Sequence, residues 1–158
     1  MNTPIFFVSD NHFQKLSNSS ESKRRAKFYS LLDHIEDVKG TLIIGGDFFD
    51  FWFDYSGYVP FEYVDMFEKL KKLRRSGSDI YYVLGNHDYW DFGFFQRNFS
   101  TETISDEFNF IQDDQSFLVV HGDGILKDDY GYRIFRRIIR SRLCIYLFNL
   151  LPPSVGYY

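Results

Sequence analysis

The sequence lacks the features that mark secreted, membrane-spanning or repetitive proteins. It has a single cysteine, Cys144, so no disulfide can form within the chain, which fits a reducing compartment. The N-terminal apolar stretch, Ile5–Val8, is too short for a signal peptide or a membrane span, and no basic segment precedes it. Internal repeats and low-complexity linkers are also missing. We therefore expect one cytoplasmic globular domain over residues 1–158.

Positive charge is in short supply as well. The 18 lysines and arginines are outnumbered by 22 acidic residues, which gives a net charge of −4 and argues against nucleic acid as a partner. Aromatic residues are instead abundant, with 19 Phe and 12 Tyr. This content fits a dense core and also favours an apolar surface with a function of its own.

Short β-branched and aromatic runs alternate with helical stretches, a pattern typical of an α/β fold. The expected strands are residues 5–8, 41–44, 80–84 and 117–120, the last paired with a segment around 108–111. Helical apolar spacing predicts helices from a Ser20 cap to Gly40, from Pro60 to Gly77, and from Asp129 to Leu150.

Polar residues follow four of the expected strands directly. They are Asp10 and His12, then Asp47, then Asn86, His87 and Asp88, and finally His121 and Asp123. In open α/β sheets the loops at the carboxyl ends of the strands converge and form the binding site. Three of the four histidines are therefore expected at one rim of the sheet, whereas His34 lies within a helix and is expected at the surface.

These residue types suit a pair of metal ions. Asp10 and Asp47 offer hard carboxylate oxygens, His12 and His121 offer nitrogens, and Asn86 offers an amide oxygen. A carboxylate can bridge two ions about 3.5–4 Å apart, and such a pair can clamp both the nucleophile and the developing charge in phosphoester hydrolysis. Each motif alone has an ordinary structural explanation, but all four in order predict a dinuclear metal site.

The same motifs carry a family resemblance. Asp10-x-His12, Gly46-Asp47, the run from Gly85 to Asp88, and His121-Gly122-Asp123 resemble, in this order, the signature of the calcineurin-like metallophosphoesterases. This resemblance implies an αββα sandwich. Two further stretches resemble the UDP-2,3-diacylglucosamine hydrolase branch: Phe49–Phe53, and the segment with Asp128, Asp129, Tyr132 and Phe135-Arg136-Arg137.

The resemblance implies an activity and a set of roles. The activity is cleavage of the pyrophosphate in UDP-2,3-diacylglucosamine to UMP and 2,3-diacylglucosamine 1-phosphate, a step of lipid A synthesis, with two divalent ions that are expected to be Mn²⁺. It implies that one ion is bound by Asp10 and His12, the other by Asn86 and His121, and both by Asp47. His87 would act on the phosphate as an acid or electrostatic stabiliser, supported by Asp88.

One part of the family signature is missing. The family pattern ends in Gly-His-x-His, which supplies a further ligand to each ion, but no histidine follows His121 in this chain. We expect a C-terminally truncated form of a longer protein. The alternative is a genuinely short protein that completes its site by dimerising. In either case the loss of ligands predicts weakened metal binding and leaves activity of this chain alone in question.

The expected helix at 129–150 is basic and amphipathic. Its apolar residues follow helical spacing, and it carries five arginines, at 133, 136, 137, 140 and 142. It is either a core helix with a solvated basic face or an element that meets acyl chains and the inner-membrane surface. By resemblance, the substrate is a nucleotide-sugar lipid, and Asp129 and Tyr132 are candidate contacts to its sugar.

Two other functions stay open. The first is a metallophosphoesterase that acts on another nucleotide or phosphodiester, because the same ligands serve all of these substrates. The second is an inactive fragment that folds but turns nothing over. Metal content would separate the second from an enzyme.

Overall fold

The computed structural model describes residues 3–15, 18–126 and 128–157. The chain divides into two compact units. The first runs as far as residue 121 with the exception of residues 55–58, and the second comprises 55–58 and the chain after residue 121.

The first unit is built on a parallel sheet. Its four strands lie in the order β1 (Ile5–Val8), β2 (Thr41–Ile44), β3 (Ile80–Val83) and β4 (Glu102–Ile104). Val8 pairs with Ile44 and Ile44 with Tyr82, so the carboxyl ends of β1, β2 and β3 lie side by side. The α/β class and the first three strands are confirmed.

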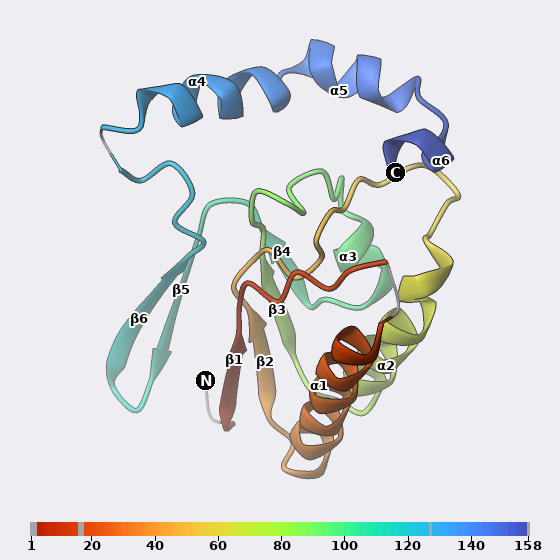
Figure 1. The fold of residues 1–158 in the computed structure, drawn as a ribbon. Coiled ribbons are helices and arrows are strands. Elements are labelled where there is room, and N and C mark those ends of the chain that lie inside the picture. Colours follow the sequence, from red (N-terminus) through yellow and green to blue (C-terminus); the bar gives the residue numbers. More distant parts are fainter. Residues whose placement is uncertain (1–2, 16–17, 127, 158) are drawn as a thin grey trace. The chain divides into compact units, whose positions relative to one another are not determined.

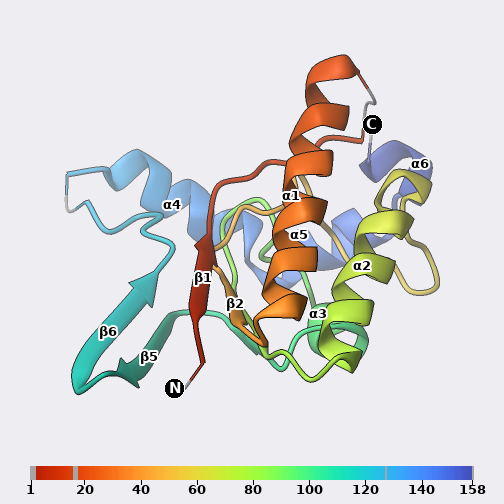
Figure 2. The same ribbon diagram turned by 90° about the horizontal axis from the view of Figure 1, so that it is seen from below.

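Helices cover one face of this sheet and a hairpin covers the other (Figures 1 and 2). The helical face carries α1 (Ser19–Asp37), the 3-10 turn η1 (Phe61–Tyr63), α2 (Val64–Arg75) and α3 (Phe94–Asn98) around an aromatic-rich core. The antiparallel hairpin consists of β5 (Glu107–Gln112) and β6 (Gln115–Val120). It packs through Phe108, whose ring stacks on Tyr81 with the ring centroids 4.6 Å apart. This layered α/β arrangement agrees with the expected metallophosphoesterase fold.

Some boundaries differ from the expectation. The N-cap of α1 is Asn18, whose Oδ1 accepts the Glu21 N–H at 2.9 Å, and Ser20 lies inside the helix. Asn and Ser are equally good caps, so composition alone could not choose between them. The short elements α3 and β4 were not predicted, since five and three residues are too few to show a periodicity.

The second unit is helical. The helix expected from Asp129 to Leu150 is two helices, α4 (Tyr130–Ile139) and α5 (Arg142–Asn149), followed by the short α6 (Pro153–Gly156). Ser141 separates them because its backbone is extended (φ −71°, ψ 148°) and its Oγ accepts the Cys144 N–H at 3.3 Å as a helix cap. Within the described part of the chain, every helix is too short or too polar to cross a membrane.

Candidate metal centre

The loops that leave β1 and β2 continue to pair beyond the strands. The Asp10 N–H donates to the Gly46 carbonyl at 3.0 Å, and the His12 N–H donates to the Asp47 carbonyl at 2.9 Å. These bonds hold the predicted ligands of the first two motifs next to each other. Main-chain hydrogen bonds alone therefore hold the two loops side by side.

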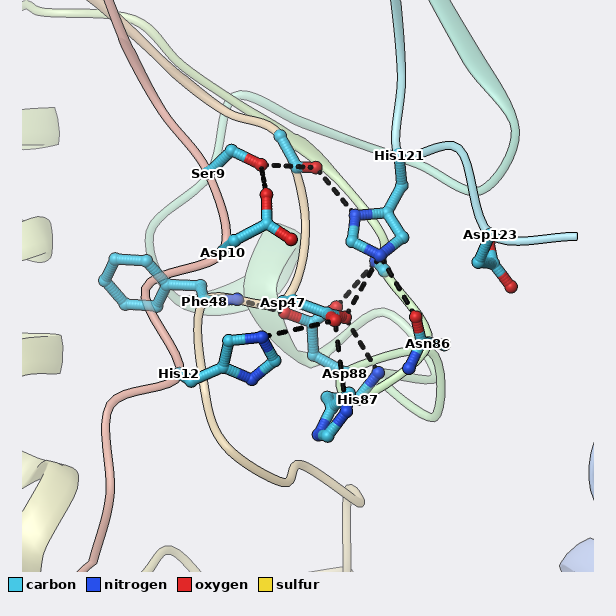
Figure 3. Close-up of polar contacts among 12 residues, drawn as sticks. Ser9, Asp10, His12, Asp47, Phe48, Asn86, His87, Asp88, His121 and Asp123 are labelled. Atoms are coloured by element: carbon cyan, nitrogen blue, oxygen red, sulfur yellow. Dashed lines mark hydrogen bonds and ion pairs between the residues drawn. The ribbon is translucent and has the colours of Figure 1, made fainter. Parts of the chain in front are cut away.

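Asp47 lies at the centre of the cluster (Figure 3). Asp47 is only 4% exposed. Its Oδ1 lies 3.4 Å from His121 Nε2, and its Oδ2 lies 3.6 Å from His12 Nε2 and 4.0 Å from His87 Nε2. A single buried carboxylate thus faces the Nε2 atoms of three imidazoles, one through Oδ1 and two through Oδ2.

The side chains form two groups that could each hold an ion. Asp10, Asp47 and His121 make one, and His12, Asp47 and His87 make the other, with the ligand atoms of each group all within 4.8 Å of one another. Asp47 belongs to both, as a bridging carboxylate must. The structure brings together Asp10, His12, Asp47 and His121, and Asn86 joins them because its Oδ1 lies 3.1 Å from His121 Nε2.

The two candidate ion-binding groups combine the ligands differently from the family resemblance. Asp10 shares a group with His121, whereas it was expected to share an ion with His12. His87, expected at the phosphate, has its ring nitrogen within reach of the His12 group. Asp10 is exposed, and its carboxylate accepts a hydrogen bond from the Ser9 hydroxyl.

Three of these residues have left-handed backbone conformations. Asp10, His12 and Asp47 have φ values of 52°, 44° and 50°. Non-glycine residues occupy this region at a cost of about 1–3 kcal/mol each, and they persist only where surrounding contacts hold them. Their concentration in one cluster indicates that the backbone is strained to aim these side chains inward.

Glycines let the loops approach closely. A Cβ on Gly46 would lie 2.5 Å from His121 Nδ1, and one on Gly85 would collide with the Asp47 carboxylate. Gly46 also has a φ of 93°, which other residues rarely adopt. A side chain at either position would push apart the groups that form the cluster.

The electrostatics of the cluster favour ionised groups. The hydrogen bond to Asp47 raises the pKa of His121 to about 9, aided by the Gly45 carbonyl and opposed by burial. Burial works to raise the pKa of Asp47, but the contacts with His121 and the His87 backbone outweigh it and lower this pKa below its ordinary value. The centre thus pairs a buried carboxylate anion with a cationic imidazole. A metal cation can take the place of the imidazole proton and neutralise the same carboxylate.

His87 and Asp88 have different surroundings. The His87 side chain is 40% exposed, its Nδ1 contacts the Asp50 carbonyl, and its backbone N–H donates to Asp47 Oδ1 at 2.9 Å. Asp88 is 0% exposed and accepts hydrogen bonds from the backbone of Phe48 and Gly85. Burial raises the pKa of Asp88 even though its hydrogen-bond donors oppose the shift.

The predicted sugar contacts belong to the second unit. Asp129 is exposed and caps α4, accepting the Tyr132 N–H at 3.2 Å. The Tyr132 hydroxyl lies 3.2 Å from Asp123 Oδ2, which also pairs with Arg136 Nε at 2.7 Å and with the Arg140 guanidinium at 3.0 Å. Asp123 thus anchors α4, a structural role that the sequence motif alone could not separate from metal ligation.

Sequence reasoning missed other residues that shape the site. Ser9 holds the Asp10 carboxylate, and the Tyr82 hydroxyl donates to Asp88 Oδ2 at 2.5 Å. Tyr82 gave no signal because it stands inside an apolar strand run, where a tyrosine is expected as core.

Comparison with known proteins agrees with this geometry. Residues 3–151 match the family described as calcineurin-like phosphoesterase. The chain belongs to this family. Enzymes of the calcineurin-like phosphoesterase family use divalent metal ions, and the two groups around Asp47 are suited to hold them.

Several relatives share one name, UDP-2,3-diacylglucosamine hydrolase. The protein from Pseudomonas putida is 29% identical over 153 residues, which are 97% of this chain and 62% of the relative. The protein from Pseudomonas fluorescens is 30% identical over 148 residues (94% and 57%), and that from Porphyromonas gingivalis is 25% identical over 141 residues (86% and 54%). The chain therefore spans between 54% and 62% of the length of these curated relatives.

Proposed function

We propose that the protein is a dinuclear-metal phosphohydrolase that cleaves the pyrophosphate of UDP-2,3-diacylglucosamine. Water adds across the P–O–P link, so the products are UMP and 2,3-diacylglucosamine 1-phosphate, each with one phosphate. The observation that carries the reaction type is that the five predicted ligands lie in one cluster, with the buried Asp47 carboxylate at its centre. The substrate rests on the relatives that bear this name.

The donor set fits a pair of hard or borderline divalent ions. Two carboxylates and one amide supply oxygens, and two imidazoles supply nitrogens, a mixture that suits Mn²⁺. We assign Asp10 and His12 to one ion, Asn86 and His121 to the other, and Asp47 to both. When bound, such a pair supplies Lewis-acid polarisation of the phosphoryl group and a nucleophile at neutral pH.

His87 is proposed to act on the phosphate directly. Its side chain is 40% exposed and therefore open to substrate. When Nδ1 donates to the Asp50 carbonyl, Nε2 is the nitrogen left to face a ligand. In the protonated form Nε2 can donate a hydrogen bond, and the positive ring stabilises charge that develops on the phosphoryl oxygens.

The second unit supports recognition of a lipid-bearing substrate. Along α4 the exposed residues Tyr130, Ile134 and Ile138 recur at intervals of four and form an apolar stripe, with Arg133 and Arg137 exposed beside it. Such a helix binds the interface of an anionic membrane through both features. We propose that α4 meets the inner-membrane surface, with Asp129 and Tyr132 contacting the sugar.

The test of the reaction compares substrates in the presence of excess Mn²⁺. We expect UMP release from UDP-2,3-diacylglucosamine, loss of this release with a chelator, and slower hydrolysis of UDP-N-acetylglucosamine and of dinucleoside polyphosphates. Equal rates on the unacylated nucleotides would overturn the substrate and leave the phosphohydrolase. Hydrolysis that survives complete metal removal would overturn both.

A further inference from the structure

Asp88 is a buried carboxylate that accepts three hydrogen bonds. It is 0% exposed. Its Oδ1 accepts the Gly85 N–H at 2.7 Å, and its Oδ2 accepts the Phe48 N–H at 2.9 Å and the Tyr82 hydroxyl at 2.5 Å. Burying a carboxylate is costly unless donors compensate it, so three donors around one group indicate a built site.

The hydrogen bonds of Asp88 and Asp47 are reciprocal. Asp88, in the loop after β3, accepts the N–H of Phe48 from the loop after β2. Asp47, in the loop after β2, accepts the N–H of His87 from the loop after β3 at 2.9 Å. The carboxylate of each loop therefore accepts a hydrogen bond from the main chain of the other loop. A shift of either loop relative to the other would strain both bonds.

The donors to Asp88 adjoin two proposed ligands. Phe48 directly follows Asp47, and Gly85 directly precedes Asn86. Gly85 also packs so closely against Asp47 that an added Cβ would collide with its carboxylate. The left-handed backbone of Asp47 needs such external support, because it is unfavourable by itself.

The surroundings of Asp88 do not suit proton transfer. Its carboxylate faces backbone amides and a tyrosine that is itself 0% exposed, whereas the His87 ring contacts the carbonyl of Asp50. Substrate would reach His87, whose side chain is 40% exposed, without meeting Asp88.

We infer that Asp88 and Tyr82 are a positioning pair that presets Asp47 and Asn86 for metal binding. The inference rests on the metal centre of the proposed function. It changes the role of Asp88 from support of a catalytic histidine to support of the ligand-bearing main chain. Second-sphere groups of this kind alter metal affinity about 10- to 100-fold when they are removed.

The test is a Mn²⁺ titration of the 158-residue chain without substrate, followed by water-proton relaxation, with each variant first shown to be folded by circular dichroism. Asp88→Asn should raise the Kd about 10- to 100-fold. Tyr82→Phe removes one of the three donors and should raise it about three- to tenfold. Tyr81→Phe is the matched control on the opposite face of the same strand, and its Kd should equal that of the wild type.

Tyr82→Phe keeps the test decisive if Asp88→Asn does not fold. A folded Tyr82→Phe or Asp88→Asn chain with wild-type Mn²⁺ affinity would overturn the positioning role and leave the metal centre standing. A wild-type chain without Mn²⁺ binding would instead overturn the metal centre, and the positioning role with it. Turnover at saturating Mn²⁺ adds a second criterion, since recovery of kcat supports positioning and a persistent loss of kcat at normal affinity contradicts it.

Discussion

At the residue scale, the proposed metal centre depends on one carboxylate. Asp47 is buried, its backbone is left-handed, and its two oxygens face different imidazoles. No nearby carboxylate could take over the proposed role of Asp47, because that role needs its buried position, its negative charge and both of its oxygens.

Asp47→Asn should therefore abolish Mn²⁺ binding at both positions. The amide keeps the size of the side chain but replaces one oxygen with a nitrogen that cannot bind a cation, so the bridge is lost. Metal content after equilibration with excess Mn²⁺ measures this. Asp37→Asn, at the exposed end of α1, is the control and should match the wild type. Retention of both ions by Asp47→Asn would contradict the bridging role.

His87→Ala separates two roles that the geometry allows. If His87 acts on the phosphate, the variant should keep its Mn²⁺ content while turnover falls about 10²- to 10⁴-fold. If it is a ligand, as its grouping with His12 and Asp47 permits, metal content should fall together with turnover. We expect the first result. Parallel measurement of bound Mn²⁺ and of kcat on the same preparation decides between them.

Asp91 should make stability depend on pH. Burial raises its pKa to about 6, although the N–H groups of Phe95 and Gly93 oppose the shift. In the folded state Asp91 therefore holds its proton up to about pH 6, whereas the unfolded chain releases it near pH 4. Unfolding releases a proton in this window, so the free energy of unfolding should fall by about 2–3 kcal/mol as the pH rises through it.

The measurement is denaturant unfolding between pH 4 and pH 7. Asp91→Asn cannot titrate and should lack this share of the decline, whereas Asp106→Asn, at an exposed site, should retain it. The same pH dependence in Asp91→Asn and wild type would show that Asp91 is charged throughout.

At the element scale, the sequence predicted the strands and helices that show a clear apolar periodicity and end in polar residues, glycine or proline. Apolar runs that end in polar residues located β1, β2 and β3 and the rim of the sheet, because the strands of a parallel sheet are largely apolar and the polar residues begin where each strand ends. The break between α4 and α5 was not predicted, since apolar spacing continues across Ser141. The hydrogen bond between Tyr82 and Asp88 could not be predicted from the sequence either. It depends on the face of the sheet toward which the loop after β3 folds.

The start of α1 provides a direct test of an element boundary. Asn18 accepts the Glu21 N–H, so Asn18→Ala should destabilise the chain by about 1 kcal/mol through loss of the N-cap. Ser20 was the cap predicted from sequence, but it is an exposed residue within the helix. Ser20→Ala should leave the midpoint of thermal unfolding unchanged or slightly raised, because Ala favours the helix interior. A larger loss from Ser20→Ala than from Asn18→Ala would contradict this start.

At the scale of the whole molecule, charge and apolar surface are unevenly distributed. The chain has a net charge of −4, yet five arginines fall between residues 133 and 142. On α4 the apolar stripe of Tyr130, Ile134 and Ile138 is 67%, 61% and 53% exposed. An anionic lipid surface would satisfy both features, since it attracts the guanidinium groups and accepts the apolar side chains.

Vesicle binding tests this docking. The chain should bind vesicles that contain phosphatidylglycerol more tightly than vesicles of phosphatidylcholine alone, and salt should weaken the binding. Each arginine near such a surface contributes about 1 kcal/mol, so Arg133→Ala with Arg137→Ala should weaken binding about 30-fold. Lys23 and Lys27 are exposed with the same spacing on α1, and their double alanine variant is the matched control. Equal weakening in both double variants would show a general effect of net charge, and no weakening in either would remove α4 from the membrane proposal.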